Sequence, residues 1–277
     1  MTMANGSGAS LGRQASAACA RLLSVLLLVL FLPACGTEPA GETLLDRAAR
    51  LAPPFAEWKV LVMAGDATAD TGAETLAFDN ARADIVVALE RVGFAPERIT
   101  QASVHPDRFP GQDLKPASLD TLGSGLSGPG RGCLLYLTSH GTPGGVVVGS
   151  AIVTPAEIHA RLSAQCVETD PVVMIVSACY SGIFVRPEMS RWNRFILTAA
   201  REDRPSFGCG ESDRYPYFDA CVLEAFPQAS GFADLAERTR ACVAAKEAGL
   251  GLVPSEPQLR IGAGAEAALS GLGFPAR

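Results

Sequence analysis

The chain has 277 residues, of which 48% are hydrophobic and 19% are charged, and its formal net charge is −6. This length and composition are ordinary for a globular protein with one large domain or two small ones. The acidic balance argues against nucleic acid as the main partner, because phosphate binding needs clustered Lys and Arg.

The N-terminal region has the pattern of an export signal. Arg13 and Arg21 precede the apolar run LLSVLLLVLFL at 22–32, which is too short to span a bilayer comfortably. The run leads into LPACG, which resembles the lipobox of bacterial lipoproteins. A plain secretory signal followed by an incidental cysteine is the alternative interpretation.

The lipobox resemblance implies a division of the chain into three parts. We expect 1–34 to be a lipoprotein signal peptide, 35–57 to be a lipidated Cys35 with a tether, and 58–277 to be the folded domain. Glycine rather than aspartate after the cysteine favours transfer to the outer membrane, with the domain facing the periplasm. The membrane is then a partner through the lipid on Cys35.

Six cysteines follow this segment, and export places them where disulfides are permitted. They are Cys133, Cys166, Cys179, Cys209, Cys221 and Cys242. We predict the pairs Cys133–Cys166 and Cys221–Cys242, and we expect Cys209 to be either a disulfide partner or a loop thiol near the site. The sequence has no Cys-x-x-Cys, so a zinc or redox motif has little support.

The predicted elements, taken in chain order, alternate between apolar strands and helices. Thr154, Pro155 and Glu157 form a helix start with a capping box pattern. Strands are predicted at 58–65, 97–104, 132–141, 172–182, 194–200 and 257–264, a hairpin at 144–154, and helices at 76–93, 116–122, 154–166, 217–226 and 231–249. This alternation predicts an α/β fold with a mainly parallel sheet covered on both faces.

Two short polar segments follow consecutive core strands. Thr138-Ser139-His140-Gly141 ends one strand and Ser177-Ala178-Cys179-Tyr180 ends the next. Ligands bind beyond the carboxyl ends of the strands in such sheets, so we expect the two segments to be adjacent. A histidine and a cysteine at neighbouring strand ends are what cysteine nucleophile catalysis needs. The backbone N–H groups of Gly141 and Cys179 are the expected oxyanion donors.

Other motifs have structural interpretations. We expect His105 and His159 to be surface or packing residues, and the alternative for Cys179 is a buried structural thiol. The GSGLSG match at 123–128 has no strand before it, so a dinucleotide site is not predicted. GxSxG and HExxH are absent from the sequence, and no metal site or cofactor is predicted.

The ordered set FDNARAD, YLTSHGTPGG, VSACYSG, ILTAAREDRPSFGC, YPYFDAC and SEPQ resembles the legumain family of cysteine peptidases, family C13 of the caspase–legumain clan. The resemblance is to its bacterial lipoprotein members and runs from about Lys59 to Gly262. It implies a caspase-like three-layer αβα sandwich, a catalytic pair of His140 and Cys179, and an oxyanion hole at Gly141. Legumains cut after asparagine and sometimes after aspartate.

The specificity pocket departs from the family pattern. Asn80 and Ala81 stand where the plant and animal enzymes have an Arg-His pair, and Ser177 replaces a pocket glutamate. We expect substitute pocket groups among Asp79, Arg82, Ser139, Ser177, Glu211 and Asp213. The predicted function is a cysteine endopeptidase acting on peptides or proteins. A catalytically silent, lipid-anchored binding or scaffold protein with the same fold is the alternative.

Overall fold

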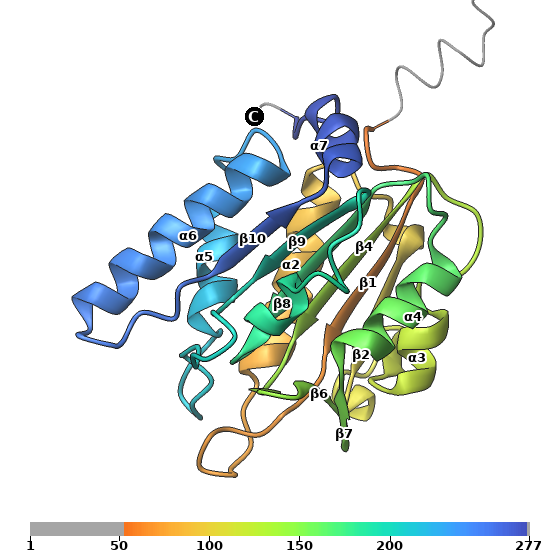
Figure 1. Ribbon diagram of the computed structural model, residues 1–277. Helices are drawn as coiled ribbons and strands as arrows, with labels where there is room; N and C mark the ends of the chain where they lie inside the picture. Colours follow the sequence, from red (N-terminus) through yellow and green to blue (C-terminus); the bar gives the residue numbers. More distant parts are fainter. Residues whose placement is uncertain (1–52, 276–277) are drawn as a thin grey trace, which may run out of the picture. The chain divides into compact units, whose positions relative to one another are not determined.

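The computed structural model of the chain describes residues 53–275 (Figure 1). The predictions for the signal peptide, for Cys35 and for most of the tether lie outside the described residues. Phe55, which we assigned to the tether, is fully buried and stacks on Phe94 with ring centroids 4.6 Å apart. The packed core therefore includes at least one residue before Trp58.

A seven-stranded sheet in the order β10-β9-β8-β4-β1-β2-β3 forms the centre of this domain (Figure 1). All neighbours are parallel except β10, which pairs antiparallel with β9. The strands are β1 (Trp58–Ala64), β2 (Ile99–Ser103), β3 (Leu114–Pro116), β4 (Gly132–Thr138), β8 (Val172–Ser177), β9 (Arg194–Thr198) and β10 (Gln258–Ile261). A second, antiparallel sheet contains β5 (Gly141–Thr142), β6 (Gly145–Val148) and β7 (Ala151–Val153).

Helices cover both faces of the large sheet, because successive side chains of each central strand point to opposite faces. Val60 and Val62 of β1 belong to the same buried core as residues of α2 (Ala77–Arg91), α5 (Tyr217–Ala225), α6 (Phe232–Gly249) and α7 (Ala263–Ser270). Leu61 and Met63 pack with α3 (Leu119–Ser124), α4 (Pro155–Gln165) and the 3₁₀ turn η3 (Ser181–Val185). The result is the predicted three-layer αβα sandwich with a mainly parallel sheet.

The strands and helices predicted from periodicity are present, with ends that differ by a few residues. The predicted capping box at Thr154 and Glu157 is formed. The short strand β3 and the helix α7 were not predicted, and neither were three 3₁₀ turns. These turns are η3 and the pair that flanks β2, η1 (Pro96–Arg98) and η2 (Pro106–Arg108).

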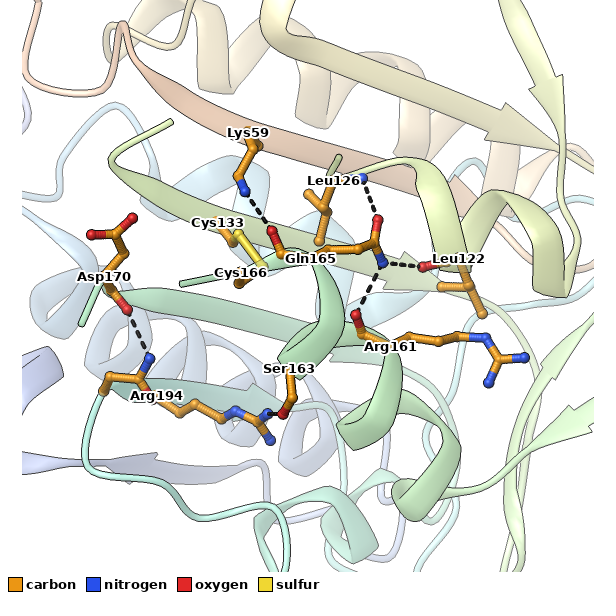
Figure 2. The surroundings of a disulfide bond; sticks show 11 residues. Lys59, Leu122, Leu126, Cys133, Arg161, Ser163, Gln165, Cys166, Asp170 and Arg194 are labelled. Atoms are coloured by element: carbon orange, nitrogen blue, oxygen red, sulfur yellow. Dashed lines mark hydrogen bonds between the residues drawn. A yellow bond between two sulfur atoms is a disulfide. The ribbon is translucent and has the colours of Figure 1, made fainter. Parts of the chain in front are cut away.

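Both predicted disulfides, Cys133–Cys166 and Cys221–Cys242, are formed. The first joins the start of β4 to the end of α4 (Figure 2). Beside it, the Gln165 amide donates to the carbonyls of Leu122 and Arg161 and accepts from the Leu126 N–H. This bond network fixes α4 against the loop that follows α3.

Within residues 53–275, no helix is long and apolar enough to cross a bilayer.

Candidate active site

The predicted catalytic segments lie side by side at the carboxyl ends of β4 and β8. These strands are parallel neighbours, and Thr138 of β4 is paired with Ser177 of β8. One residue further on, the Ser139 N–H donates to the Ser177 carbonyl over 3.0 Å. His140 and Cys179 therefore both follow strands that end at the same edge of the sheet.

Gly141 lies directly against the backbone of Cys179. A Cβ at position 141 would lie 2.0 Å from the Cys179 carbonyl oxygen and 3.1 Å from Cβ of Ala178. A contact of 2.0 Å is far inside van der Waals range, so only glycine fits here without displacing backbone. The segment that contains His140 is therefore packed directly against the segment that contains Cys179.

The His140 ring is oriented by one hydrogen bond and one aromatic contact. Its Nε2 lies 2.8 Å from the Thr68 carbonyl oxygen, and Phe78 packs edge-on at a centroid distance of 5.2 Å. A carbonyl only accepts, so Nε2 carries the proton and Nδ1 of the neutral ring has the free lone pair. Nδ1 faces the Asp70 carboxylate, 4.0 Å away.

The Cys179 thiol is held by Ser206, a residue that the sequence did not single out. The Ser206 N–H donates to Cys179 Sγ over 3.2 Å, and the Ser206 carbonyl accepts from the thiol over 3.4 Å. Tyr180, directly after the cysteine, has a left-handed backbone with φ of 58°, which is unusual for a residue with a side chain. This turn redirects the chain at the strand end and leaves Cys179 partly exposed.

A buried carboxylate, Asp219 of α5, is hydrogen-bonded to the ends of both β4 and β8. It accepts hydrogen bonds from Tyr136 (2.5 Å), Thr138 (2.7 Å) and Ser177 (2.8 Å). Burial raises the pKa of Asp219 to about 6, and the three donated hydrogen bonds oppose that rise. The sequence placed this aspartate in a family motif, YPYFDAC, but gave no sign of its partners.

Four of the predicted pocket residues are buried. Asp79 and Arg82 form an ion pair of 2.9 Å with 3% and 0% side-chain exposure, and Asp79 also accepts from Ser103. Ser139 donates to the Val147 carbonyl, and Ser177 donates to Asp219. Because their polar atoms are used inside the domain, this geometry does not support direct substrate contact by any of the four.

The other two, Glu211 and Asp213, line an open cavity of about 650 Å³. Glu211 accepts from the Thr71 hydroxyl over 2.7 Å, and Asp213 accepts from the Gly210 N–H. The cavity wall also contains Glu74, Thr75, Leu76, Asn80, Arg108, Ser212 and Arg214. Carboxylates and guanidinium groups thus face one hollow beside the loop that follows β9.

Cys209 is not disulfide-bonded, and neither is Cys179. The Cys209 side chain is buried, and its thiol donates to Asp70 Oδ1 over 3.4 Å. Burial, which is the largest cause, acts with the nearby Asp70 carboxylate and Cys179 to raise the pKa of this thiol to about 12. Cys209 is therefore the loop thiol of the two predicted alternatives.

Residues 126–241, which include both strand ends, match the family model described as the Peptidase C13 family. These residues are those of a legumain-like peptidase of family C13. The match supports the general class of cysteine peptidase for this C13 domain, whose substrates are then peptides or proteins.

Solved structures show the same fold around the C13 domain. Caspase-1 from Spodoptera frugiperda is 11% identical with a TM-score of 0.53, over 76% of this chain and 88% of that one. A structure described as pro-sf-caspase-1 is also 11% identical with a TM-score of 0.54, over 74% of this chain and 91% of that one. At this identity the similarity concerns the caspase-like fold alone. No curated protein gives a significant match.

Proposed function

We propose that the protein is an endopeptidase in which Cys179 and His140 form the catalytic pair. The observation that carries the proposal is the contact of Gly141 with the Cys179 backbone, which joins the histidine segment to the cysteine segment. A thiol nucleophile and an imidazole in one partly open site are the groups that acyl transfer from a peptide requires. The C13 family match supports the same class of reaction.

The steps follow from the orientation of the groups. Cys179 Sγ attacks the scissile carbonyl, and the backbone N–H groups of Gly141 and Cys179 stabilise the oxyanion. The His140 ring donates Nε2–H to the Thr68 carbonyl, so Nδ1 is the nitrogen that accepts the Cys179 thiol proton and then delivers it to the leaving amine. Water then hydrolyses the thioester and releases the acid. If an amine replaces water, the same thioester gives transpeptidation.

We propose asparagine, and secondarily aspartate, as the residue before the cleaved bond. The open cavity beside the loop after β9 offers both carboxylates (Glu211, Asp213) and guanidinium groups (Arg108, Arg214). A side-chain amide donates to the first kind of group and accepts from the second. This mixed lining supports an amide in the pocket better than a purely apolar side chain.

The experiment that tests this function compares cleavage of a peptide library by the purified domain, by Cys179→Ala and by His140→Ala. We expect cleavage by the unmodified domain, with asparagine enriched before the cut, and losses of at least 10³-fold in both variants. Equal cleavage by all three proteins would assign the activity to a contaminant. No cleavage by any of them in the presence of a reductant would favour the silent scaffold.

We also propose that the domain is exported and lipid-anchored at Cys35, facing the periplasm from the outer membrane. The apolar run at 22–32 and the LPACG segment support this. Metabolic labelling with an alkyne-tagged fatty acid tests it. The full chain should carry the label, and Cys35→Ser should not; equal labelling of both would contradict lipidation at this cysteine.

A further inference from the structure

Three side chains of the types that bind metal ions lie close together beyond the carboxyl ends of the central strands. Asp70 Oδ1, a ring nitrogen of His140 and Cys209 Sγ all lie within 4.8 Å of one another. They come from three separate loops, after β1, after β4 and after β9. Peptide hydrolysis by a thiol uses neither Asp70 nor Cys209, so two of the three groups have no part in the proposed reaction.

The distances suit a small transition-metal ion. Asp70 Oδ1 is 3.4 Å from Cys209 Sγ and 4.0 Å from His140 Nδ1. A point equidistant from three atoms with these separations, and a third side of at most 4.8 Å, lies roughly 2.4 Å or less from each. Bonds from zinc to cysteine sulfur, histidine nitrogen and carboxylate oxygen are about 2.0–2.3 Å, so small side-chain rotations suffice.

The histidine is already in the form that binds a metal. Nε2–H donates to the Thr68 carbonyl, which leaves the Nδ1 lone pair directed to the side of Asp70. Metal-ligating histidines usually donate their second ring N–H to a carbonyl or carboxylate in this way. Thr68 is two residues before Asp70, so one loop supplies both a ligand and the group that orients another.

The two outer loops are joined to each other before any ion arrives. The Thr71 hydroxyl donates to Glu211 over 2.7 Å, and the Thr75 hydroxyl donates to the Gly210 carbonyl over 3.0 Å. The bonded residues closely follow Asp70 on one loop and Cys209 on the other. The ligand set is thereby held together although Asp70 itself is largely exposed.

We propose that Asp70, His140 and Cys209 form a binding site for zinc or a similar transition-metal ion, and that the bound ion inhibits the peptidase. Binding replaces the thiol proton of Cys209, which is released to solvent, with a metal–sulfur bond. The ion occupies Nδ1 of His140 and so removes the proton carrier from the reaction. Only the inhibition rests on the proposed function; the binding site does not.

Binding is tested directly on Cys179→Ala protein, titrated with Co²⁺ and then with Zn²⁺ in competition with a chromophoric chelator. We expect one ion per chain and a thiolate-to-cobalt charge-transfer absorption, because Cys209 and not Cys179 supplies the sulfur. Adding Cys209→Ser should remove that absorption and weaken zinc binding at least about tenfold. Adding Asp70→Asn, at an exposed position that does not endanger folding, should also weaken it at least several-fold. Asp120→Asn, at an exposed position on α3, is the matched acidic control and should change neither the absorption nor zinc binding.

The outcomes separate this site from the peptidase proposal. The expected binding pattern together with zinc inhibition that Asp70→Asn relieves supports both. The expected pattern in a protein that cleaves no peptide supports the metal site and rejects the peptidase. Absence of binding to Cys179→Ala protein, or binding unaffected by both Cys209→Ser and Asp70→Asn, overturns the metal site.

Discussion

Gly141 and Cys179 are in backbone contact: a Cβ on Gly141 would lie 2.0 Å from the Cys179 carbonyl oxygen. The two residues come from different strands, and β8 is reached from β4 only after the hairpin and α4. Their contact therefore depends on the whole crossover being correctly packed. It sets the position of both proposed oxyanion donors relative to the thiol.

Gly141→Ala should abolish peptide cleavage, with a loss of at least about 10²-fold in kcat, the scale of removing one oxyanion donor. The added methyl must push the Cys179 carbonyl away, so we also expect a fall in Tm. The matched control is Gly123→Ala in α3, where a Cβ meets no atom within 4 Å. A fully active Gly141→Ala protein would show that this contact has no role in the reaction.

Asp219 should position the site through Thr138 and Ser177. Thr138→Val removes one donor from the buried carboxylate, and we expect kcat to fall about tenfold with little change in KM. Thr138→Ser retains the hydroxyl and should retain activity. Loss of activity in both variants, or in neither, would contradict a positioning role exerted through the hydroxyl.

Asp219 should also give the protein a measurable pH dependence of stability. Its folded pKa of about 6 lies above the ordinary value of 3.8, so the protonated form is favoured by folding. The contribution is complete below pH about 4 and is lost as the pH rises through 6, a change of roughly 2–3 kcal/mol. Urea unfolding of the unmodified domain and of Asp219→Asn, between pH 4 and 7, should show their difference changing by this amount. A pH-independent difference would contradict the raised pKa.

The Cys133–Cys166 disulfide should stabilise the domain without affecting catalysis. It closes a sequence separation of 33 residues, for which the chain-entropy relation gives about 3–4 kcal/mol. It lies at the start of β4, whereas His140 follows the end of that strand. The double variant Cys133→Ser/Cys166→Ser should lose that much free energy of unfolding while kcat/KM at 25 °C stays within about twofold. A large loss of kcat/KM in folded protein would contradict this separation.

The buried pair Asp79–Arg82 should act on stability and not on specificity. Arg82→Leu leaves the Asp79 carboxylate buried without its partner, which costs about 3–5 kcal/mol of unfolding free energy. Asp79→Leu/Arg82→Leu removes both charges and should recover part of that loss. Library profiling of the double variant should give an unchanged preference before the cut. A changed preference for the residue before the cleaved bond would show that Asp79 or Arg82 contributes to the substrate pocket.

The sequence carried enough information for the sheet and for the two disulfide pairs. Short, β-branched apolar runs such as 172–176 are typical of central strands in a covered sheet, and the polar residues that end them mark one edge. Residues typical of a helix N-terminus, such as Thr154, predicted where a helix begins. The strand β3 could not be predicted because its three residues are too few to show a periodic pattern.

The side-chain partners could not be predicted, because they depend on tertiary contacts. Arg82 and Asp79 have the spacing of a surface helix pair, yet Ser103 and Gln101 of β2 enclose them. Ser206 and Asp70 are ordinary loop residues in the sequence, and only the folded chain brings them to Cys179 and Cys209. The polar residues that end the two core strands, together with the family resemblance, therefore predicted His140 and Cys179 as a candidate pair, but they did not predict the residues that surround this pair.

The most direct test of the central claim is covalent labelling of the purified domain by a peptidyl electrophile with asparagine in the position before the cut, followed by peptide mapping. The domain has two cysteines outside disulfides among the described residues, Cys179 and Cys209, so the label chooses between them. We predict one adduct per chain on Cys179, lost in Cys179→Ala and formed far more slowly in His140→Ala. Labelling of Cys209 instead, or equal rates with and without His140, would contradict the assignment of the catalytic pair.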